Sequence, residues 1–270
     1  MTVPSDAMAD EQDLATIKST SQSDPTKSDQ AVLTTTALAA YSVDLGPQSP
    51  ALSGDPGQIV TYSLTLTNQG NITDTIDLNA SGYTWTTSLS VTQLELDPGE
   101  SASLDVYVTV PSDAMAGEQD LATVTATSQG NPVKSDQAVL TTTALATYSM
   151  DCSSDNPALS GLAGQKLTYT VTLTNTSNTT DTIVLDASGN SWTTNLPVTE
   201  ATLGAGESTQ VIVYVTIPAD AAGGEYDTAT ITATSQGDPG VSDSATLTTT
   251  ALVTFKIYMP LVGNDSSSLE

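Results

Sequence analysis

Carboxylates are the only potentially reactive side chains that this sequence holds in quantity. The chain has 31 Asp and Glu residues, no His and a single cysteine, Cys152. Histidine-dependent triads and zinc sites with His ligands are therefore excluded, and one thiolate cannot build a zinc site alone. A glycosidase needs two carboxylates facing each other in a concave site, whereas the acidic residues here fall in turns and on the outer faces of expected strands. We predict that the chain is not an enzyme.

Calcium is the one cofactor that these carboxylates favour, because the ion takes about six to eight hard oxygen ligands. The loop PSDAMAGEQD supplies Asp113, Glu118 and Asp120, and the following repeat supplies Asp151 and Asp181. If adjacent domains meet at this loop, the five side chains could form an interdomain calcium site. There is no EF-hand pattern and no Asp-x-Asp-x-Asp run, so a merely solvating role is the competing interpretation.

Three other kinds of residue are candidates for sites. Trp85 and Trp192 occupy the same repeat position, which favours core packing over the functional alternative, a platform for stacking sugars. Cys152 stands where the first copy has Leu45, which favours a small apolar substitution over a reactive thiol. Sequons for N-glycosylation begin at Asn71, Asn79, Asn175, Asn178 and Asn264.

The charge balance excludes several classes of partner. The formal net charge is −26, with only five basic residues. Nucleic acid and anionic membranes both require clustered Lys or Arg, so neither is expected to bind. No run approaches the roughly 18 apolar residues of a membrane helix, so we expect no membrane insertion. A strongly acidic surface is typical of a protein that must stay soluble in salt-rich surroundings.

A long internal repeat sets the domain organisation. The phrase KSDQAVLTTTALA begins at Lys27 and again at Lys134, and VTYSLTLTNQGNITDTIDLNASG from Val60 aligns with LTYTVTLTNTSNTTDTIVLDASG from Leu167. A unit of 107 residues, the distance from Lys27 to Lys134, is too long for a solenoid repeat and fits one small domain. We predict a partial repeat at 1–38, domains at 39–145 and 146–252, and a C-terminal tail at 253–270 that ends in vector-derived Leu269 and Glu270.

Short alternating runs bounded by Gly, Pro, Asn and Asp predict an all-β fold. In the first full copy we expect seven strands, at 41–45, 58–68, 72–79, 84–91, 101–110, 119–128 and 135–145. The side chains that should share the buried face are Leu64, Leu66, Leu104, Val106, Val108 and Val110. Seven strands in about 100 residues are typical of an immunoglobulin-like (Ig-like) β-sandwich, here in tandem. Residues 1–38 would then be the last strands of a truncated domain, and we expect them to be disordered, docked on a neighbour or paired with another chain.

The motif order carries a family resemblance. YSLTLTNQGNITDTIDL, then a Trp, then PGESASLDVYVTVPSDAMAGE and TVTATSQG resemble the Ig-like modules that occur in tandem in bacterial secreted and surface proteins, including those beside glycosidases. The resemblance covers residues 39–252, and the tail FKIYMPLV is similar to the C-termini of secreted multidomain proteins of this kind. It implies an extracellular accessory or stalk module and no reaction.

The functional expectation is a structural or interaction module. We predict a tandem Ig-like stalk or spacer of an extracellular or cell-surface bacterial protein, serving adhesion, presentation or anchoring. The expected partners are other copies of the repeat, surface proteins or glycans. The alternative is a carbohydrate-binding or substrate-positioning module of a secreted enzyme, in which Trp85 would contact sugar.

Overall fold

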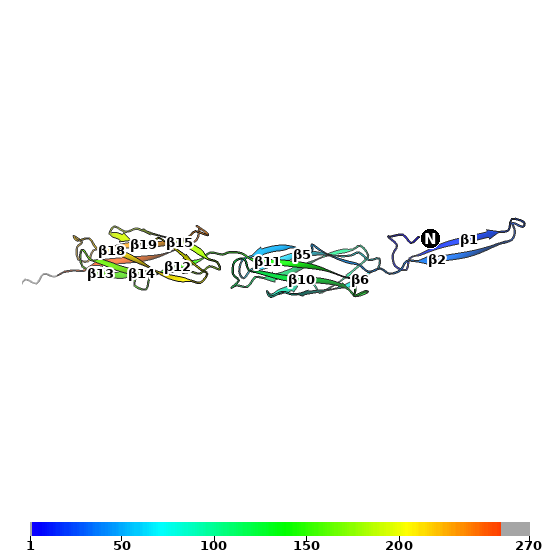
Figure 1. Cartoon of the computed structure of the whole chain (residues 1–270), viewed down its shortest axis with the longest axis horizontal. Coiled ribbons are helices and arrows are strands. Elements are labelled where there is room, and N and C mark those ends of the chain that lie inside the picture. The colour runs from blue at the N-terminus through cyan, green and yellow to red at the C-terminus, as the bar shows by residue number, and fades with distance from the viewer. Residues whose placement is uncertain (1, 255–270) are drawn as a thin grey trace, which may run out of the picture. The chain divides into compact units, whose positions relative to one another are not determined.

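The computed structural model describes residues 2–254, and every regular element in that range is a β-strand (Figure 1). The chain divides into two compact units, residues 1–146 and 147–270. The first unit holds a two-stranded hairpin followed by a sandwich, and the second holds another sandwich. Within the described range, no helix is long and apolar enough to cross a membrane. The all-β prediction is confirmed, whereas most of the predicted tail, from residue 255, lies outside the described residues.

The first sandwich pairs a five-stranded sheet with a four-stranded sheet. The order in the five-stranded sheet is β4 (Ala51–Gly54), β11 (Ser135–Ala144), β10 (Gln119–Ser128), β6 (Asp74–Ser81) and β8 (Gln93–Leu96). The order in the four-stranded sheet is β3 (Val43–Gly46), β5 (Ile59–Asn68), β9 (Ser101–Thr109) and β7 (Thr87–Leu89). Neighbouring strands are antiparallel except β4 and β11, which are parallel.

The core of this sandwich follows from the period-two pattern of its long strands. Every second residue of β5 and β9 points between the sheets, and Leu64, Leu66, Val106 and Val108 are fully buried. The predicted inward face is therefore confirmed. Removing each of these side chains from water contributes about 1.5–3 kcal/mol, which explains why such a Thr-rich sequence can still hold two sheets together.

The structure contains two short strands that the sequence pattern did not predict. The run expected at 41–45 continues past Pro47 as β4, because the chain crosses from the edge of one sheet to the edge of the other. β3 then pairs with β5, whereas β4 pairs with β11. The run expected at 84–91 shrinks to β7, and β8 follows it at the edge of the opposite sheet.

The second sandwich repeats the same topology. Its five-stranded sheet has the order β13 (Ala158–Gly161), β20 (Ser242–Ala251), β19 (Tyr226–Ser235), β15 (Asp181–Ser188) and β17 (Glu200–Leu203). Its four-stranded sheet has the order β12 (Met150–Ser153), β14 (Lys166–Asn175), β18 (Ser208–Thr216) and β16 (Thr193–Asn195). The parallel pair β13 and β20 corresponds to β4 and β11.

A tyrosine ties the two sheets together in each sandwich. The Tyr62 hydroxyl on β5 donates a hydrogen bond to the carbonyl oxygen of Thr141 on β11, at 2.6 Å. The Tyr169 hydroxyl on β14 makes the same bond to Thr248 on β20, at 2.8 Å. Burial raises the pKa of both phenols, which favours the protonated hydroxyl that donates these bonds.

The N-terminal partial repeat forms an ordered hairpin. Its strands are β1 (Gln12–Thr20) and β2 (Ser28–Thr36), and their register is that of β10 and β11 in the first sandwich. No third strand lies beside them within the described residues. Ile17 and Leu33 are 58% and 46% exposed, so the hairpin folds while its apolar face stays open.

Candidate functional site: the joint before the first sandwich

A single asparagine connects the hairpin, the connector and the first sandwich. Asn71 lies in the loop between β5 and β6, and its Oδ1 accepts a hydrogen bond from the Ala40 amide at 2.7 Å. Its Nδ2 donates to the carbonyl oxygens of Ala7 and Leu38, each at 3.0 Å. The main chain adds two more bonds, from Asn71 N to Ala40 O at 3.0 Å and from Ala9 N to Asn71 O at 2.9 Å. One residue thus holds three separate segments together.

The loop that carries Asn71 is fixed from beneath by a second asparagine. Asn68 is buried, and its Nδ2 donates to the carbonyl oxygens of Ile72 and Leu96, each at 2.9 Å. Its Oδ1 accepts from the Gly70 amide. A Cβ at Gly70 would lie 2.5 Å from the carbonyl oxygen of Ala40, so the position of this loop against the connector leaves no space for a side chain at residue 70.

An aromatic ring fixes the other side of the connector. Tyr41 packs against Gly130 in the loop between β10 and β11, where a Cβ would come within 2.0 Å of the ring. The Gly130 amide donates to Oδ1 of Asp74, which is buried at the start of β6. The ring therefore rests on main chain that is itself held to the sandwich, and residues 40 and 41 are anchored from two directions.

The second sandwich anchors its own connector in the same way. Oδ1 of Asn178 accepts a hydrogen bond from the Thr147 amide at 2.8 Å. Tyr148 packs against Gly237, where a Cβ would come within 2.1 Å of the ring. Asp181 accepts from the Gly237 amide at 3.1 Å. Each of these residues lies 107 positions after its counterpart in the first sandwich.

This arrangement supplies mechanical constraint. An asparagine amide carries no charge, so its bonds do not depend on pH, and each neutral hydrogen bond contributes about 0.5–1.5 kcal/mol. Main-chain bonds and a packed ring restrict rotation of the connector without any side chain that could attack a substrate. The site is thus suited to holding segments in fixed positions.

The structure gives structural roles to several proposed calcium ligands. Asp120 is buried, and its Oδ1 accepts hydrogen bonds from the amide and the hydroxyl of Thr84, both at 2.7 Å. Glu118 is exposed and closes a turn by accepting from the Met115 amide at 3.1 Å. Asp113 is exposed.

The remaining two candidates lie in the second sandwich. Asp151 is exposed on β12 and accepts a hydrogen bond from the Ser153 hydroxyl, whereas Asp181 is buried. No group of three or more acidic, His or Cys side chains is placed to hold a metal ion among the described residues. The calcium site stays a prediction.

The four described sequons differ in how accessible their side chains are. Asn79 is exposed on β6. Asn175 is buried, and its Nδ2 donates to three carbonyl oxygens, which leaves no room for a sugar. A glycan on Asn71 would replace a hydrogen of the amide that binds two carbonyls, and Asn178 anchors a connector. Asn264 lies outside the described residues.

Neither tryptophan offers a face for stacking a sugar. Trp85 and Trp192 are 4% and 6% exposed and belong to the two cores, so the core-packing interpretation is confirmed.

Cys152 is likewise buried in the second core. Burial and the neighbouring Asp243 raise the pKa of its thiol to about 11, so the thiolate that would react is not populated at neutral pH.

The anchoring role of Asn71 and Tyr41 was missed at the level of sequence. A sequon at Asn71 suggested a surface modification, and the aromatic in the connector attracted no hypothesis. A usable signal was present, because Asn71, Tyr41 and Gly130 each recur 107 residues later. When the same residue recurs in an exposed loop or connector, where core packing does not require it, the recurrence indicates contacts that hold adjacent segments together.

Comparison with known families identifies the class of both sandwiches. The model of the Ig-like domain of VWA7 matches residues 46–146, and the model of the Ig-like fold at the C-terminus of FixG matches residues 168–251. The chain therefore carries tandem Ig-like modules. No curated protein matches it.

Solved structures with a similar fold include three of different origin. The EC1–3 segment of protocadherin gamma C5 is 12% identical, with 89% of this chain and 77% of that chain covered and a TM-score of 0.47. A protein of unknown function from Porphyromonas gingivalis W83 is 14% identical, with coverages of 77% and 99% and a TM-score of 0.34. The periplasmic chaperone SfaE is 12% identical, with coverages of 77% and 100% and a TM-score of 0.31. TM-scores this low support no inference about function.

Proposed function

We propose that the chain is a tandem Ig-like stalk or spacer of an extracellular bacterial protein, which presents or anchors another domain or a partner at a cell surface. The observation that carries this proposal is the anchored connector. Each sandwich holds the residues just before its first strand with an Asn amide and a Tyr ring packed on a Gly. Folding of a sandwich by itself would not require these two separate contacts, the Asn amide and the Tyr ring, with its connector.

The proposed mechanism is mechanical. Each sandwich acts as a rigid body because a β-sheet covers each side of its core. The anchored connector limits how far one sandwich can rotate relative to the next. The large negative charge favours solubility. No catalytic step is part of this function, and the partners are other copies of the repeat, surface proteins or glycans.

The carbohydrate-binding alternative depended on the tryptophans, and both are buried. A glycan array would test it directly. Binding that is lost in Trp85→Ala without loss of folding would favour the alternative over the stalk. The stalk predicts no glycan binding that depends on Trp85.

The stalk function is tested at Asn71. Replacing it with Ala removes the acceptor of the Ala40 amide and the donor to Ala7 and Leu38. We expect hydrogen exchange at the Ala40 amide to accelerate about 5-fold, since one neutral hydrogen bond contributes about 1 kcal/mol. Melting of the first sandwich should change little, because Asn71 lies outside its core.

Asn79→Ala is the matched control, because Asn79 is exposed on the outer face of β6. Its exchange pattern at the connector should equal that of the wild type. Connector amides that already exchange at the unprotected rate in the wild type would contradict the proposal.

A further inference from the structure

The hairpin presents one half of a sandwich core with the other half missing. Its inward side chains correspond to buried residues of the first sandwich through an identical strand register. Leu33 is 46% exposed, whereas its counterpart Leu140 is completely buried, and Ile17 is 58% exposed, whereas Val124 is completely buried. Such a contiguous apolar face is costly to leave in water.

The free edge of β2 offers main-chain donors in a fixed pattern. In the first sandwich, the amides of Val139, Thr141 and Leu145 donate to the carbonyl oxygens of Gln48, Pro50 and Gly54 at 2.7–3.0 Å. The equivalent amides on the hairpin belong to Val32, Thr34 and Leu38, and β2 has only β1 as a neighbour among the described strands. A strand equivalent to β4 would fit this edge.

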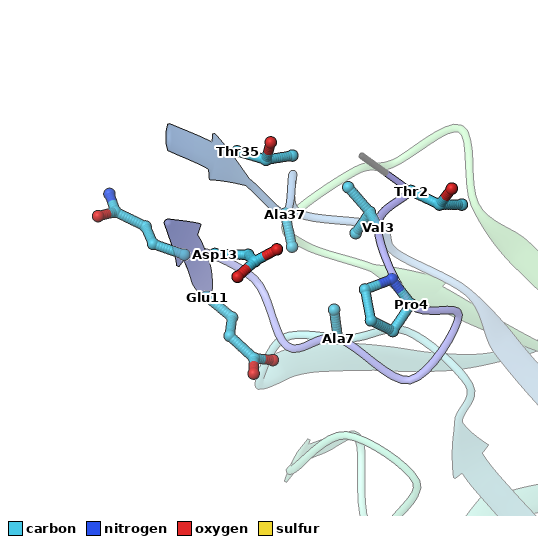
Figure 2. Close-up of a pocket in the computed structure, with 9 residues that line it drawn as sticks. Thr2, Val3, Pro4, Ala7, Glu11, Asp13, Thr35 and Ala37 are labelled. Atoms are coloured by element: carbon cyan, nitrogen blue, oxygen red, sulfur yellow. The ribbon is translucent and has the colours of Figure 1, made fainter. Parts of the chain in front are cut away.

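A cavity of about 280 Å³ lies at the base of the hairpin (Figure 2). It is lined by Val3, Ala7 and Ala37 among others. Their counterparts Val110, Ala114 and Ala144 are buried in the first core. A Cβ placed on Gly54 there would lie 2.6 Å from Val60 and 3.4 Å from Val110. An equivalent of Gly54 would therefore lie beside Val3, which lines this cavity.

Two carboxylates on the hairpin add polar specificity. Asp13 and Asp29 are exposed. Their counterparts accept hydrogen bonds from the missing half of the fold: Asp120 from Thr84 at 2.7 Å, and Asp136 from the Leu45 amide at 2.8 Å. A second hairpin could cover the apolar face, but it has no equivalent of Thr84 or Leu45.

We propose that the open face of the hairpin is a docking surface for a half-domain equivalent to residues 39–107 of this chain. In the repeat register Met1 corresponds to Val108, so residues 39–107 are the part of the repeat that has no counterpart in the hairpin segment. It would supply the strand beside β2, the strand beside β1, the second sheet and the donors for Asp13 and Asp29. The inference goes beyond the stalk function and does not depend on it.

The test is to extend the chain with a second copy of residues 39–107 fused ahead of residue 1. Hydrogen exchange at Val32, Thr34 and Leu33 should slow about 100-fold or more relative to the unextended chain, because opening these amides would then require opening a closed core. Protection should approach that of Val139, Thr141 and Leu140 in the same molecule. Unchanged exchange in the hairpin would overturn the proposal.

Two neighbouring substitutions in the extended chain control for nonspecific effects. Leu33→Asp places a charge on the inward face and should abolish the added protection. Val32→Asp lies on the outward face, where its counterpart Val139 is 37% exposed, and should preserve it. If sedimentation of the unextended chain shows a dimer whose formation protects the hairpin equally well, a second copy is the occupant and the half-domain proposal is wrong.

Discussion

Many acidic side chains, which the charge balance alone marks as solvating surface, close turns or anchor loops in the folded chain. Glu118 closes its turn by accepting the Met115 amide, and Glu11 and Glu225 do the same in the other two copies. Asp227 accepts hydrogen bonds from the Ser191 and Trp192 amides and so fixes the buried indole. Composition could predict the number of acidic residues but not these contacts. The glutamates accept from amides only three residues away, whereas the two partners of Asp227 lie 36 and 35 residues away in the sequence.

The buried phenols predict a loss of stability at alkaline pH. Burial raises the folded-state pKa of Tyr62 and Tyr169 above 10.0. Their contribution to folding stability is therefore complete below the pKa of the unfolded state. It is lost as pH rises through the raised pKa of the folded state. The Cys152 thiol, with a folded pKa of about 11 against 9.0, acts in the same direction.

Thermal melts between pH 8 and pH 11.5 should show a falling melting temperature at the alkaline end. Replacing both tyrosines with Phe removes two hydrogen bonds from each sandwich, at about 1 kcal/mol each, and should flatten this fall. A double variant that declines as steeply as the wild type would show that other groups cause the alkaline loss.

At the scale of elements, the long strands could be predicted and the short ones could not. The runs around Leu64 and Val106 alternate cleanly and form β5 and β9 as expected. The strands β4 and β8 have only four residues each, and they exist because distant partners lie beside them. The role of Asn71 was hidden for the same reason, since the Ala7 and Leu38 carbonyls that it binds are brought together only by the hairpin.

The packing of the connector ring on a glycine predicts a specific sensitivity. In Gly237→Ala the added methyl group would come within 2.1 Å of the Tyr148 ring, so the ring must leave its place. We expect a loss of about 1–3 kcal/mol in the free energy of unfolding of the second sandwich, as for other overpacked sites.

Gly204→Ala provides the comparison within the same sandwich, because a Cβ there meets only Glu207 Oε2 at an ordinary 3.4 Å. Denaturant melts followed by Trp192 fluorescence in a Trp85→Phe background would report on this sandwich alone. Equal effects of the two substitutions would contradict the role assigned to the ring.

At the scale of the whole molecule, the repeat was the most informative feature of the sequence. It predicted two complete sandwiches and a partial one, because a sequence that recurs over 107 residues must fold the same way each time. The fate of the partial repeat was less predictable. Its strands form a hairpin without the rest of their core, since the β1–β2 ladder is local in sequence.

The calcium hypothesis also belongs to the whole molecule. A bound ion would raise the melting temperature, with about 2.7 kcal/mol of stabilisation at 100 times the dissociation constant. Calorimetry with calcium against chelator measures this directly. Asp113→Asn should reduce the effect, because Asp113 is an exposed candidate ligand. An unchanged melting temperature in the wild type would discard the site.

The central claim is that the connector is held firmly enough to turn Ig-like domains into a spacer. Residual dipolar couplings of the wild-type protein test it most directly, measured for β1–β2 and for the strands of the first sandwich. If the Asn71 and Tyr41 contacts hold, one alignment tensor will fit both sets of couplings. Separate tensors, with a markedly smaller one for the hairpin, would show a freely turning connector and contradict the account.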